Sequence, residues 1–164
     1  MVNYMGQACD SYVSKTGLVL KPAESPYAPD LPAGQLDALL ENPGKHQQHS
    51  ASVLMKLLYA ARMAAPWLCV AISRLAKQIH KWTADCDRRL HRLYCYIFAT
   101  QQQVLSGSLS TADLPNVSVE FWCDADLNGD MMSSKSTSGR WIELKGNEGR
   151  CMPLHWASKQ QGST

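Results

Sequence analysis

Residues 117–126 read VSVEFWCDAD, and this stretch decides how the C-terminal third of the chain folds. The side chains of Val119, Phe121 and Cys123 fall on every second position, which is the period of a β-strand whose two faces meet different surroundings. The strand runs directly into Asp124. We therefore expect a strand that ends beside a carboxylate.

Two further strand candidates follow this stretch. Residues 139–144 and 152–156 are short and contain bulky side chains, and the sequence KGNEG at 145–149 between them favours a turn. Consecutive strands joined by short turns pair in antiparallel fashion. We expect a β-meander over residues 116–164.

Residues 51–110 show helical periodicity instead. Apolar side chains recur at three- and four-residue spacing in successive stretches that are separated near Pro66 and Thr83. Asp85 and Asp87 fall in the first turn of the last stretch, where the helix dipole favours anions. A helical segment followed by strands predicts the α+β class.

The remaining segments differ in composition. Residues 1–17 fit one short helix that ends near Gly17. Residues 18–50 contain five prolines and scattered glycines, which favours a linker or a long surface loop. Residues 106–115 are rich in Ser, Gly, Asp and Pro, so we place a domain boundary there.

Charge is distributed unevenly along the chain. Residues 51–110 carry eight basic side chains and two acidic ones, whereas residues 111–150 have a net charge of −3. A basic helical face could follow a nucleic-acid backbone, although solvated helix faces are commonly rich in the same residues. Both interpretations stay open for the candidate nucleic-acid-binding residues, which are Arg74, Lys77, Lys81, Arg88, Arg89 and Arg92.

Cysteine and histidine placement gives little sign of a metal site. The six cysteines are scattered without a close pair of the kind that holds zinc, and His80 and His91 lack partners at ligand spacing. The N-terminus lacks a signal-peptide pattern, and no apolar run approaches the roughly 20 residues of a membrane span. We expect an intracellular protein of the cytoplasm or nucleus, with reduced thiols and no membrane partner.

The sequence DADLNGD at 124–130 is the densest group of potential ligands. It matches the opening of a calcium-binding EF-hand loop, but Lys135 stands where that loop needs a glutamate, and the approach is a strand. The same residues could form an acidic turn. A third interpretation makes Asp124 a catalytic carboxylate that helps to hold Mg²⁺ for phosphodiester hydrolysis.

Several segments occur in a fixed order along the chain. They are LLYAARMAAPW at 57–67, KW at 81–82, DCDRRLHRL at 85–93, DAD at 124–126 with GD at 129–130, KSTSG at 135–139 and WASKQ at 156–160. In this order they resemble the copia class of long-terminal-repeat retrotransposon Pol proteins. Ala65 and Trp67 depart from the family, which usually has Arg and Asp there.

This resemblance implies a reverse transcriptase thumb or connection over residues 51–110 and an incomplete, truncated ribonuclease-H-like sheet over residues 116–164. Asp124 then matches the Mg²⁺-binding aspartate of the first RNase H strand, and the parent polyprotein would act on an RNA/DNA hybrid. The polymerase aspartates would lie upstream of Met1 and the RNase H glutamate beyond Thr164. We therefore expect the isolated chain to be inactive.

Overall fold

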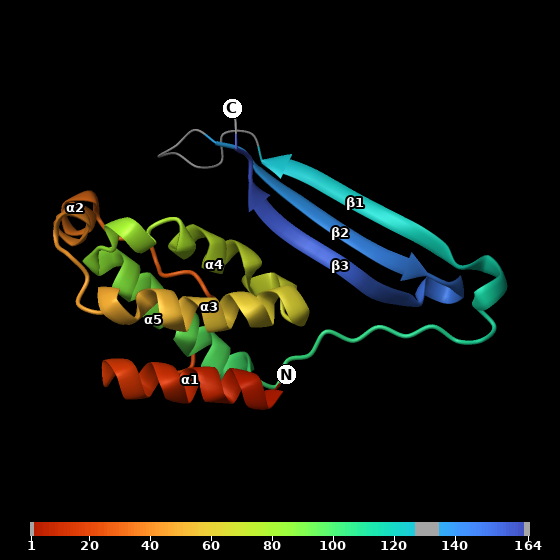
Figure 1. The fold of residues 1–164 in the computed structure, drawn as a ribbon, viewed down its shortest axis with the longest axis horizontal. Coiled ribbons are helices and arrows are strands. Elements are labelled where there is room, and N and C mark those ends of the chain that lie inside the picture. The colour runs from red at the N-terminus through yellow and green to blue at the C-terminus, as the bar shows by residue number, and fades with distance from the viewer. Residues whose placement is uncertain (1, 127–134, 163–164) are drawn as a thin grey trace. The chain divides into compact units, whose positions relative to one another are not determined.

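The protein divides into two compact units. The computed structural model describes residues 2–126 and 135–162. Unit 1 spans Met1–Val104 and unit 2 spans Leu105–Thr164. In the described residues, five α-helices are followed by a three-stranded antiparallel sheet, so the expected α+β class is confirmed (Figure 1).

Unit 1 contains all five α-helices. The predicted N-terminal helix is present as α1, and the three apolar stretches of residues 51–110 give α3, α4 and α5 (Figure 1). Helix α1 packs against α3 and α5, and α4 packs against α3. The bounds are α1 Val2–Thr16, α2 Ala33–Glu41, α3 Gln47–Met63, α4 Cys69–Ala76 and α5 Ala84–Thr100.

The core of unit 1 is built from the apolar stripes. Leu57, Ile72 and Leu93, from three different helices, are completely buried. Tyr12 and Tyr94 stack with ring centroids 4.0 Å apart, and their burial joins α1 to α5. Stacked aromatic pairs add to the free energy gained from buried area. Burial of these stripes therefore accounts for the packing of the helices.

The loop expected over residues 18–50 is corrected by the structure. It contains helix α2, and α3 begins at Gln47 rather than at residue 51. Pro43 forms an isolated bridge with Thr83, which ties this segment to the start of α5. At Gly44 a Cβ atom would lie 2.7 Å from the carbonyl oxygen of Thr83, so a side chain there would disrupt the bridge.

Unit 2 is the expected meander, with longer strands than the sequence indicated. The strands β1 Ser118–Asp126, β2 Thr137–Lys145 and β3 Cys151–Gln160 are ordered β1-β2-β3 (Figure 1). A bulge interrupts the pairing of β2 with β3 between Ile142 and Glu143. Glu148 and Gly149 have positive φ angles and turn the chain between these strands.

Candidate functional site

Asp124 lies in the last third of β1 and is exposed to solvent. Its Oδ1 accepts a hydrogen bond of 2.8 Å from the backbone N–H of Ala125, and its cross-strand partner is Gly139. Asp126 is two residues further along β1, and the alternation of side chains places it on the same face of the sheet. The strand therefore presents two carboxylates to solvent.

These carboxylates do not amount to a two-metal site. Among residues 2–126 and 135–162, no three His, Cys, Asp or Glu side chains are grouped so that they could hold a metal ion. Hydrolysis with two ions needs several ligands around both of them. Asn128, Gly129 and Asp130 lie outside the described residues, so the structure describes the EF-hand-like sequence only as far as Asp126.

Two of the predicted nucleic-acid-binding residues neutralise a buried carboxylate. Asp85 is 3% exposed. Its Oδ1 accepts hydrogen bonds from Arg88 Nε at 3.0 Å and Nη2 at 2.8 Å, and its Oδ2 accepts one from Arg89. A buried charge without partners is costly. These two guanidinium groups therefore act within the first turns of α5, although Arg89 keeps part of its surface in water.

Three arginines also hold a segment of unit 1 without regular secondary structure, residues 23–30, which we call the strap. Arg88 Nη1 donates to the carbonyl of Pro29 at 2.8 Å, and Arg92 Nε donates to the carbonyl of Ser25 at 3.0 Å. The guanidinium of Arg74 lies 5.7 Å from the centre of the Tyr27 ring, within cation–π range. Arg74, Arg88, Arg89 and Arg92 thus all make contacts inside unit 1.

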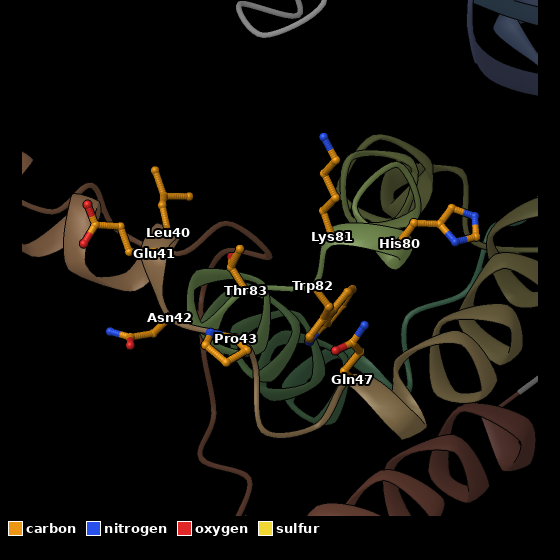
Figure 2. A pocket seen from close by; sticks show the side chains of 9 residues that line it. All are labelled: Leu40, Glu41, Asn42, Pro43, Gln47, His80, Lys81, Trp82 and Thr83. Carbon is orange, nitrogen blue, oxygen red and sulfur yellow. The ribbon is translucent and has the colours of Figure 1, made fainter.

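The two lysines of the predicted set lie at the end of α4 and just beyond it. Lys77 caps α4 and is exposed. Lys81 is also exposed and borders a shallow pocket of about 290 Å³. In Figure 2 its side chain extends away from Trp82 and Gln47, which line the same pocket. Arg74, Lys77, Lys81 and Arg89 are thus exposed, whereas Arg88 and Arg92 are partly buried.

Asp87 has a structural role that the sequence did not reveal. Its Oδ1 accepts a hydrogen bond of 2.7 Å from the indole N–H of Trp82, and its Oδ2 accepts one of 3.3 Å from the backbone N–H of His46. Trp82 is 3% exposed and belongs to the pocket wall. Asp87, in the first turn of α5, thus links His46 at the start of α3 to Trp82 just before α5.

A second cluster that the sequence missed lies between α1 and α5. The Tyr12 hydroxyl and His91 Nδ1 are 3.2 Å apart, and Cys95 Sγ is 3.5 Å from His91 Nε2. Burial lowers the pKa of His91 and raises those of Tyr12 and Tyr94. The neutral forms are favoured, so this cluster is a packed polar contact. The i, i+4 spacing of His91 and Cys95 was its only sequence signal.

Asp113 is the most heavily hydrogen-bonded carboxylate described in unit 2. It is fully buried and accepts hydrogen bonds from the backbone N–H and hydroxyl of Ser110, from the backbone N–H of Asn147 and from the guanidinium of Arg150. The Ser110 backbone and Arg150 hold the pKa of Asp113 well below its ordinary range. This carboxylate joins the segment before β1 to the β2–β3 turn.

Comparisons with known proteins give no relative for this chain. No protein-family model, no curated protein and no solved structure matches it. No helix of the described residues is long and apolar enough to cross a membrane.

Proposed function

We propose that this chain is a piece of a copia-type retrotransposon Pol polyprotein. Residues 51–110 would correspond to the thumb or connection of the reverse transcriptase, and residues 116–164 to the opening strands of the RNase H domain. The parent protein would act inside the cell, synthesising DNA on an RNA template and degrading the RNA of the resulting hybrid.

The register of the sheet is the observation that supports this proposal. The three C-terminal family segments are separated in sequence, yet they pair side by side at one end of the meander. Asp124 is opposite Gly139, and Gly139 is opposite Ser158. Likewise Ala125 is opposite Ser138, which is opposite Lys159. The resemblance implies a short antiparallel meander in which DAD at 124–126 pairs with KSTSG at 135–139, and KSTSG pairs with WASKQ at 156–160.

Asp124 would be the metal-binding carboxylate of the parent enzyme. Bound Mg²⁺ would stabilise the attacking and leaving oxygens of the cleaved phosphodiester. Asp124 is exposed and could reach such an ion, while the described residues supply too few ligands to hold it. We infer that the isolated chain does not cleave RNA.

An RNA/DNA hybrid is the partner that this proposal requires. If all six predicted basic residues contacted phosphates, the log–log dependence of affinity on salt would have a slope of about −5. The arginines among them already make contacts within unit 1. We therefore expect a shallower slope, and an Asp124→Asn variant should bind the hybrid as well as the unchanged chain.

The decisive experiment uses the genomic sequence on both sides of this reading frame. The proposal expects an Asp-Asp polymerase motif upstream and a glutamate-bearing helix downstream. The extended protein should cleave the RNA of a hybrid in Mg²⁺, and Asp124→Asn should reduce the rate by roughly a hundredfold or more. Absence of both flanking motifs, or full activity of the Asp124→Asn protein, would contradict the proposal.

A further inference from the structure

The register of the sheet aligns three tryptophans on one of its faces. Trp122 is opposite Trp141, which is opposite Trp156, and directly opposed residues project to the same side. The rings of Trp141 and Trp156 stack with centroids 5.6 Å apart. Trp122 is 58% exposed. We call this side of the sheet the tryptophan face.

The tryptophan face is acidic. Side chains alternate between the two faces along each strand, and in the described strands this places four carboxylates and one cation, Lys145, on the tryptophan face. The cations Arg140 and Lys159 lie on the opposite face. The resulting net charge of −3 would attract cations. The carboxylates are Glu120, Asp124, Asp126 and Glu143.

Glu120 and Glu143 form a like-charge pair on the tryptophan face. They are directly opposed in the register, an arrangement that like charges make unfavourable. Lys145 Nζ lies 2.9 Å from Glu120 Oε1, and Trp141 Nε1 donates to Glu143 Oε2 at 2.7 Å. Glu120 Oε2 is buried and has no hydrogen-bond partner among the described residues. A further cation beside the two glutamates would offset their repulsion.

We propose that the tryptophan face binds a polypeptide segment bearing arginine side chains. The planar guanidinium matches both parts of the surface, since it stacks on indole rings and donates to carboxylates through a fixed fork. Trp122 supplies the accessible ring, and Glu120 with Glu143 supplies negative charge beside it. This inference uses neither Mg²⁺ nor a nucleic acid, although Asp124 belongs to the same face of the sheet.

The test measures binding of a short alternating glycine–arginine peptide to the full chain. The indole N–H signals of Trp122, Trp141 and Trp156 in NMR spectra should shift on titration. A glycine–glutamate peptide of equal length and single-stranded oligothymidine serve as competing probes. We expect neither of them to shift these signals.

Two variants and a charge-matched control make the test specific. Trp122→Ala and the nearly isosteric Glu120→Gln/Glu143→Gln should each weaken binding about tenfold. Glu24→Gln/Glu41→Gln changes the charge of the whole chain equally, at exposed sites in unit 1, and should leave affinity unchanged. Circular dichroism establishes that each variant is folded.

Several results would overturn the inference. They are equal weakening in the control, no binding of the arginine peptide, and preferential binding of oligothymidine. Concentration-dependent dimerisation that buries the three indoles without peptide would show instead that a second copy covers this face.

Discussion

Replacing Asp85 by Ala should destabilise unit 1 more than any exposed acidic substitution. The carboxylate is almost fully buried and receives two guanidinium groups. Removing one partner of a fully buried ion pair costs about 3–5 kcal/mol. Here the side chains of Arg88 and Arg89 are 26% and 49% exposed, so both regain some hydration in the variant. We expect a loss of about 2–3 kcal/mol.

The assay is urea and thermal unfolding of the full chain, followed by circular dichroism at the helix signal, because the α-helices of the described residues belong to unit 1. The loss corresponds to a decrease in Tm of roughly 10–20 °C for a unit of this size. Asp37→Ala, at an exposed position in α2, is the control and should change stability by less than about 0.5 kcal/mol. If Asp85→Ala costs no more than this control, the buried ion cluster does not stabilise unit 1.

Three further predictions concern other buried groups. The folded pKa of Asp113 lies below its unfolded value of roughly 4, so its stabilisation of unit 2 is present above that pH and lost as the pH falls toward the folded pKa. Asp113→Asn should flatten this acid dependence in urea unfolding followed by NMR signals of β2. Tyr94→Phe removes the 3.0 Å hydrogen bond to the Val53 carbonyl and should cost about 1 kcal/mol in urea unfolding of unit 1. Burial raises the pKa of Cys9 to about 11, so a thiol reagent at mildly alkaline pH should modify the exposed Cys123 before Cys9. Cys123→Ser should abolish the fast phase of the reaction. Fast modification of Cys9 would contradict its burial.

Short-range periodicity in the sequence predicted the helices of residues 51–110 and the first strand. The apolar stripes of residues 51–110 indicated three helices, and the alternation after residue 117 indicated a strand, because both periods follow from backbone geometry alone. Helix α2 was missed because prolines punctuate its surroundings and its nine residues are too few for a clear stripe. The strand ends were placed too short since pairing, rather than composition, extends a strand.

The contacts of the candidate nucleic-acid-binding arginines could not be predicted from the sequence. Their charge and spacing were visible in the sequence, but Arg88 contacts Pro29 across 59 residues and Arg92 contacts Ser25 across 67 residues. A sequence pattern cannot distinguish a solvated cation from one that binds a distant carbonyl. The same holds for Asp113, which lies in a loop-like stretch and is paired with Arg150 across 37 residues.

The sequence by itself determined the α+β order of this protein, the acidic end of β1 and the uneven charge, because these depend on residue type and short-range period. Only the tertiary structure decided which charges remain available. In the folded chain, arginines of α4 and α5 contact the strap and Asp85. The pairing of the strands places Trp122, Trp141 and Trp156 on one acidic face. The physical reason is that burial and long-range pairing set the free energy of a charge or an indole ring, and both arise only when distant segments meet.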